Sequence, residues 1–232
     1  MSDVLRSGLA ALLLAFVHVA HGPIEARLRP YGAIWRPLSA GVAIGYVFLY
    51  LLPKMARYAA GSGDGQVDTV LFAWALAGML LFYVVDRFRG RTRWHGLAVG
   101  LHGAGYTAYF LLFGYLVARL GTAREGYVPY GAIVAVMALH FTAVDHLVRE
   151  WHPAAFDRVL RWLFALALVT GWLLGELTPL PGTVVATWTA LLAGAILLNV
   201  LNLELPRPTG PLWPFLAGVG FFAAVSRLVS AG

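Results

Sequence analysis

The sequence predicts an all-α protein that crosses a membrane several times, with residues 1–232 forming a single transmembrane domain. Hydrophobic residues make up 60% of the chain and charged residues only 12%, about half the charged share of soluble domains. One soluble core of this size could not bury so much apolar surface. The apolar runs also lack the alternation of polar and apolar residues that membrane β-barrel strands require.

A run of about 20 apolar residues is long enough to cross the hydrocarbon core as a helix. Pro, Gly and Arg separate eight such runs, which lie near residues 4–22, 33–53, 67–86, 96–120, 128–150, 156–176, 183–204 and 211–230. No small-residue cleavage site follows the first run, so we expect a first span there rather than a signal peptide.

The basic residues predict the orientation of the chain. The net charge of +6 indicates a membrane surface rather than nucleic acid, because the basic residues are scattered between apolar spans. With both termini outside, the inner segments hold 11 basic residues and the outer segments 6, which together are the 17 Lys and Arg of the chain. The positive-inside rule therefore predicts a multi-pass protein of the cell (inner) membrane with both termini outside.

Several classes of chemistry are excluded by missing residues. The chain has no cysteine, so disulfides and thiolate ligands are excluded. It contains no Walker loop, no nucleophile elbow and no His-Glu-x-x-His motif. We therefore do not expect an enzyme.

Two segments of the chain resemble each other. Residues 39–54 read SAGVAIGYVFLYLLPK and residues 192–207 read LAGAILLNVLNLELPR; both have an early Ala-Gly pair, a central Val and a closing Leu-Pro before a basic residue. In the predicted topology they run in opposite directions, as in the inverted repeats of secondary transporters. Alternatively, small residues and a terminal Pro are common in packed membrane helices.

With these two segments the chain resembles the ZIP (Zrt/Irt-like) family of divalent-metal transporters, whose second and seventh spans typically end in a Leu-Leu-Pro-acid pattern. Eight spans with both termini outside also agree with that family. The resemblance implies a three-two-three inverted-repeat bundle in which the fourth and fifth spans carry the metal. It implies a divalent cation, zinc, iron or manganese, as the cargo.

The family's fourth span usually carries His-Asn-x-x-acid, and its fifth carries His-Glu-x-x-His-Glu. Here the fourth span reads LHGAGYTAYF, so His102 matches the leading His and Tyr106 stands at the position of the acid. The fifth reads LHFTAVDHL, so His140 matches the first His and Asp145 the last Glu. The resemblance implies His102 and His140 as metal ligands, with Tyr106 and Asp145 as weaker candidates.

The departures from the family pattern reduce this site. Phe141 and Val144 stand where the family has two further ligands, so we expect one ion rather than two. His140 and Asp145 are five residues apart and do not share a helix face. Without a metal, the histidines would be neutral and hydrogen-bonded inside the bundle, and Asp145 would pair with Arg149, four residues further on.

The leading hypothesis is a ZIP-like protein that binds or transports a divalent metal cation by alternating access. Two alternatives remain open: a non-transporting relative that acts as a membrane scaffold or sensor, and a membrane haem protein that uses His18 and His21 of the segment HVAH. The expected partners are the lipid bilayer and the metal ion. Small-residue faces in AGVAIG and AGMLL could also support a homodimer.

Overall fold

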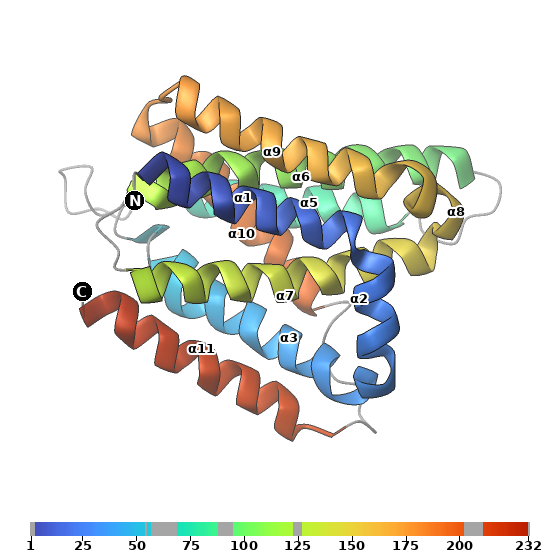
Figure 1. The fold of residues 1–232 in the computed structure, drawn as a ribbon. Coiled ribbons are helices and arrows are strands. Elements are labelled where there is room, and N and C mark those ends of the chain that lie inside the picture. The colour runs from blue at the N-terminus through green and yellow to red at the C-terminus, as the bar shows by residue number, and fades with distance from the viewer. Residues whose placement is uncertain are drawn as a thin grey trace.

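The computed structural model describes residues 3–53, 55–56, 69–87, 95–122, 127–201 and 211–231, and the regular secondary structure in these ranges is helical throughout. Eight long helices pack into one bundle (Figure 1). They are α1 (Asp3–Val19), α3 (Gly32–Tyr46), α5 (Thr69–Arg87), α6 (His95–Thr122), α7 (Tyr127–Trp151), α9 (Arg161–Leu177), α10 (Gly182–Asn199) and α11 (Trp213–Ala231). The all-α prediction is confirmed.

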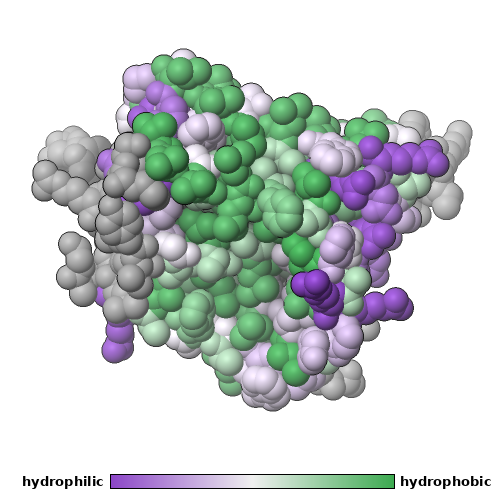
Figure 2. Space-filling model, viewed as in Figure 1, coloured by the Kyte–Doolittle hydropathy of each residue, from purple (hydrophilic) through white to green (hydrophobic). Residues whose placement is uncertain are grey.

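Six helical segments of the described chain are long and apolar enough to cross a membrane: residues 21–51, 69–87, 96–119, 130–151, 153–177 and 182–199. The helices α1 and α11 are not among them, although their 17 and 19 residues fall within the length range of membrane-spanning helices. Figure 2 shows apolar side chains across the middle of the visible face and hydrophilic side chains toward its ends. Such a banded surface suits contact with lipid.

Short helices connect the long ones at the end of the bundle opposite the two chain termini (Figure 1). They are α2 (His21–Leu28), η1 (Arg29–Tyr31), α8 (Pro153–Ala155) and the π-turn η4 (Phe156–Leu160); we call this end the α2 end. The sequence predicted a loop after residue 22, because Gly22 and Pro23 are weak helix formers. Pro23 lies in the first turn of α2, where its missing N–H removes no helical hydrogen bond.

Glycine allows the backbones of α3 and α11 to touch. A Cβ atom at Gly41 would overlap the carbonyl oxygen of Phe215, and one at Gly218 would overlap the carbonyl oxygen of Leu38. The two helices therefore cross backbone to backbone, with one glycine from each at the contact. Helices in lipid gain their association energy from such close packing, because the surrounding lipid tails are as apolar as the side chains.

The pair α10 and α5 crosses in the same way. A Cβ at Gly194 would overlap the carbonyl oxygen of Ala75, and one at Gly78 would overlap that of Leu191. Gly41 of α3 and Gly194 of α10 occupy the same position in the two similar segments. The carbonyls that these two helices contribute to the crossings, those of Leu38 and Leu191, each lie three residues before that glycine. The helices α6 and α9 form a third extensive pair.

We predict that Gly218→Ala destabilises the folded protein by about 1–3 kcal/mol, because the added methyl group forces α3 and α11 apart. The matched control is Gly220→Ala on the same helix, where a Cβ meets open space. Replacing this helical glycine should stabilise the protein by up to about 1 kcal/mol. Thermal unfolding in detergent, followed by tryptophan fluorescence, measures both; equal melting temperatures for the two variants would contradict the crossing.

Candidate functional site

His102 and Tyr106, one helical turn apart on α6, line the same small cavity. Its walls come from four long helices, α5, α6, α7 and α10, and consist of Phe82, Val85, Asp86, His102, Tyr106, Trp151, Leu198 and Asn199. The cavity has room for about one water-sized group. The two side chains therefore share one face of α6, and both are almost completely buried.

The hydrogen bonding of His102 fixes which ring nitrogen carries its hydrogen. Nδ1 lies 2.8 Å from the carbonyl oxygen of Ala98, one turn earlier on α6. A carbonyl can only accept, so Nδ1 is the donor and, in the neutral ring, the lone pair is on Nε2. Histidines that ligate metals usually donate their other N–H to a carbonyl or carboxylate in this way. The Nε2 atom of His152 also lies 3.3 Å from His102 Nδ1.

Tyr106 connects α6 to α10. Its hydroxyl donates to Oδ1 of Asn199 at 3.2 Å. The Nδ2 atom of Asn199 is buried and has no hydrogen-bond partner among the described residues. An amide donor and a carbonyl oxygen from α10 therefore border the cavity beside the imidazole of His102.

His140 does not line this cavity. Its side chain is fully buried on α7, and its ring lies 6.2 Å from that of Phe141. Within the part of the chain that the structure describes, no three His, Asp or Glu side chains are close enough together to hold a metal ion. Phe141 and Val144, which stand at two ligand positions of the family pattern, are fully buried.

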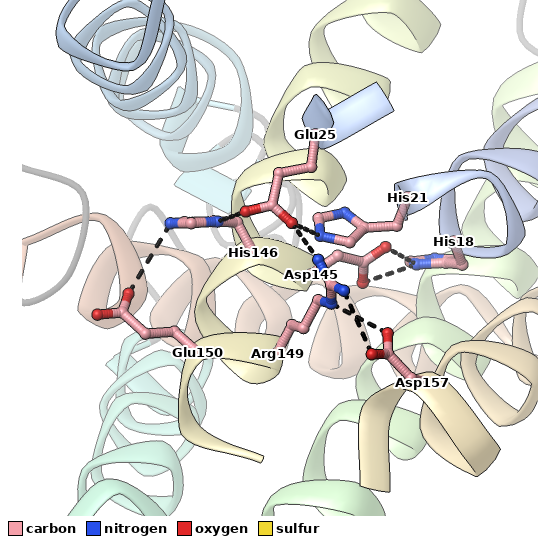
Figure 3. Close-up of polar contacts among 8 residues, drawn as sticks. All are labelled: His18, His21, Glu25, Asp145, His146, Arg149, Glu150 and Asp157. Atoms are coloured by element: carbon pink, nitrogen blue, oxygen red, sulfur yellow. Dashed lines mark hydrogen bonds and ion pairs between the residues drawn. The ribbon is translucent and has the colours of Figure 1, made fainter. Parts of the chain in front are cut away.

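Asp145 lies in a second polar centre, which pairs it with α1 (Figure 3). Its two carboxylate oxygens lie 2.9 and 2.8 Å from Nδ1 of His18, and neither side chain has any exposed surface. The expected pair of Asp145 with Arg149 is wrong: the long-range partner replaces the local one. Because Asp145 faces His18 and not the cavity, we leave it out of the ion site proposed below.

Three phenylalanine rings surround the imidazole of His18. The ring centroid of Phe110 lies 4.3 Å away in an edge contact, that of Phe141 lies 5.3 Å away in a stacked contact, and that of Phe164 lies 6.0 Å away. They come from α6, α7 and α9, so the pair forms where four helices meet. The Nε2 atom of His18 has no hydrogen-bond partner among the described residues.

Glu25 of α2 is the centre of a set of ionic contacts at the α2 end. Its carboxylate lies 3.2 Å from Nε2 of His21, 2.8 Å from Nδ1 of His146 and 2.6 Å from Nη1 of Arg149. Arg149 also donates two hydrogen bonds, of 3.0 and 3.2 Å, to Asp157. The network thus ties α2 to α7 and to η4.

The sequence did not identify several residues of the two polar centres. Glu25, His152 and Asp86 were not singled out, and Asn199 was not assigned to the site. A usable signal was the spacing of His18, His21 and Glu25, which are three and four residues apart and fall on one helix face. Nothing in the local sequence indicated that this face meets Asp145.

The fold and these two polar centres define a multi-pass helical membrane protein with ionisable side chains buried inside its bundle. Comparison with protein-family profiles, curated protein sequences and solved structures gives no match for this chain.

We predict that Asp145→Ala lowers the free energy of unfolding by about 3–5 kcal/mol, because it leaves His18 without its partner in an apolar cage. Asp157→Ala removes a carboxylate that is 46% exposed and should cost at most about 1 kcal/mol. Chemical or thermal unfolding in the same detergent compares them. A loss for Asp145→Ala no greater than that for Asp157→Ala would contradict a stabilising role for the pair.

Proposed function

We propose that this protein binds or transports a divalent metal cation, in the zinc, iron and manganese class, within a ZIP-like three-two-three bundle of eight spans. The observation that carries the proposal is the cavity around His102, where a buried imidazole nitrogen, a phenol and an amide converge inside a membrane bundle. Ionisable groups inside membranes usually mark ion or substrate pathways.

The glycine crossings support an inverted repeat. In the proposed architecture the second span corresponds to the seventh and the eighth to the third, so the α3–α11 crossing is equivalent to the α10–α5 crossing. Both use a glycine from each helix and a carbonyl three residues earlier. Both α3 and α10 also pass into a π-turn at the same repeat position, at Val47 and Val200. The closing Leu205 and Pro206 of the second segment lie outside the described residues.

The ligand chemistry fits one borderline cation. With its Nδ1–H bound to Ala98, His102 presents Nε2, a nitrogen donor that zinc, iron and manganese all accept. Tyr106 and Asn199 add oxygen ligands. His140, buried on the fifth span, is proposed as the second nitrogen ligand, brought to the ion by the alternating-access movement of α6 and α7.

We propose that both termini lie outside the cell membrane. Arg27, Arg29 and Arg158 are exposed on the short helical segments of the α2 end, and Arg36 is exposed on the first turn of α3. Positively charged connections remain on the cytoplasmic side. The α2 end is then cytoplasmic, and the end that carries both termini faces outward.

The second candidate is a non-transporting relative that acts as a scaffold or sensor. It is favoured by the small size of the cavity and by the hydrogen bond between Tyr106 and Asn199, which closes one wall. A haem protein is favoured less, because the nearest polar partners of His18 and His21 are carboxylates.

We predict that purified wild-type protein in detergent retains a zinc-like ion and that the double variant His102→Ala/His140→Ala loses it. Elemental analysis followed by zinc titration measures this. His146→Ala is the matched control, because it removes a histidine of α7 that is hydrogen-bonded to Glu25 and lies outside the proposed site.

Uptake into proteoliposomes then separates transport from binding. A transporter takes up the ion and loses this uptake in the single variant His102→Ala, whereas a protein that binds the ion without transporting it shows no flux even as the wild type. Equal zinc binding by the wild type and the double variant would rule out this site, and protein that binds no metal at all would favour the scaffold.

A further inference from the structure

We infer that His18 and Asp145 form a proton-binding site, which exchanges one proton with the aqueous phase at the α2 end through His21 and Glu25. This inference does not depend on a metal ion, because it concerns side chains that do not line the His102 cavity.

The first step is the number of protons that the pair holds. Asp145 and His18 have no exposed surface, and aromatic rings enclose the imidazole. With a neutral imidazole and a carboxylate the pair carries one negative charge, which is costly inside a membrane bundle. One added proton makes the pair neutral, whether it resides as imidazolium with carboxylate or as imidazole with carboxylic acid. The dry surroundings therefore favour the protonated pair.

The second step is the supply of compensating charge from neighbouring elements. On α6 and α9 the groups facing His18 are phenylalanines. The ionisable groups whose charges act on the neighbouring His21 ring are Asp145, Glu25, His146 and Arg149. Arg149 donates hydrogen bonds to Glu25 and to Asp157 of η4. The cation of Arg149 is therefore already offset by two carboxylates, and a proton is what remains to neutralise the buried pair.

The third step is a route to water. The exposed fraction falls from 20% at Glu25 to 1% at His21 and 0% at Asp145. Nε2 of His21 lies 3.2 Å from Oε2 of Glu25. The negative charges of both Glu25 and Asp145 act on the His21 ring. Figure 3 shows the His21 ring between these two carboxylates. A proton taken up at Nε2 on the Glu25 side can leave from Nδ1 to Asp145 once the ring turns; the ring is then neutral again.

The alternation of carboxylate and imidazole matches the proton relays of membrane pumps and transporters. Each member accepts a proton on one side and releases one on the other, so no oxidant, reductant or metal is required. His18 is the end of the route within the described part of the chain, because three phenylalanine rings pack around it and its Nε2 atom has no hydrogen-bond partner there.

The test is magnetic resonance of the ¹⁵N-histidine-labelled full chain in lipid nanodiscs, from about pH 5 to about pH 8, combined with infrared spectroscopy of carboxyl groups. His18→Gln assigns the ring signal and Asp145→Asn assigns the carboxyl band. We expect either an imidazolium at His18 or a protonated Asp145 at neutral pH, and loss of that signal in the partner's variant. A neutral His18 together with an ionised Asp145 would overturn the proposal.

The route is tested by hydrogen–deuterium exchange of the His18 ring N–H. Glu25→Gln should slow this exchange by about 100-fold, because it removes the proton-transferring carboxylate. The matched control, Glu150→Gln, changes an acid that is 64% exposed and should leave the rate unchanged. Equal rates in the two variants would overturn the route.

A double variant tests the site even if the single variants fail to fold. His18→Gln/Asp145→Asn keeps an amide hydrogen bond between α1 and α7 but has no group that binds a proton. It should fold and release one proton fewer per chain than the wild type when the pH is raised, because the remaining titratable groups are the same in both proteins. Equal proton release by the folded double variant and the wild type would overturn the site.

Discussion

The pairing of Asp145 with His18 is the constraint on which the arrangement of α1, α6, α7 and α9 depends. A carboxylate on a helix inside a membrane bundle must find a partner in the protein, because neither lipid nor water can serve. The partner lies 127 residues away in the sequence, so α1 and α7 have to be neighbours. Aromatic rings from α6 and α9 then complete the enclosure, and the close α6–α9 packing keeps them in place.

The two polar centres use different helices and different chemistry. The His102 cavity is formed mainly by α5, α6 and α10 and holds neutral donors and acceptors beside Asp86. The His18–Asp145 centre lies among α1, α6, α7 and α9 and continues into ion pairs at the α2 end. The helix α6 contributes to both, through His102 and Phe110, which are two helical turns apart, and α7 contributes to both through Trp151 and Asp145. A shift of α6 along its axis would therefore move side chains at both centres. Such a shift would couple the proposed ion site to the proposed proton-binding site.

Sequence reasoning predicted the parts of the fold that composition and periodicity determine. Eight apolar runs became eight long helices, and the four-residue spacing placed His102 and Tyr106 on one face. It failed at α2, where Gly22 and Pro23 suggested a loop, because helix propensity is a weak guide where tertiary contacts hold a segment. Here Glu25 supplies those contacts by bonding His146 and Arg149 of α7.

The partner of Asp145 could not be predicted for a related reason. The pairing of opposite charges four residues apart on a helix predicted Arg149 as the partner. That residue lies near the end of α7, where it is hydrogen-bonded to Glu25 and Asp157 instead. Asp145 is one turn deeper, where His18 of α1 is its hydrogen-bond partner. Depth within the bundle therefore decided between the two partners, and depth emerges from the packing of all the spans rather than from spacing along one of them.

Phe141 has a definite packing role in this arrangement. Phe141 stands where the ZIP pattern has a glutamate, and its ring stacks on His18 and contacts Phe110 and Phe113. A second carboxylate at this point would face Asp145 across the imidazole, and the two like charges would repel each other inside a dry cage. An aromatic ring instead excludes water and encloses the pair. Phe141 at this position thus allows a single buried acid to remain stable with one histidine.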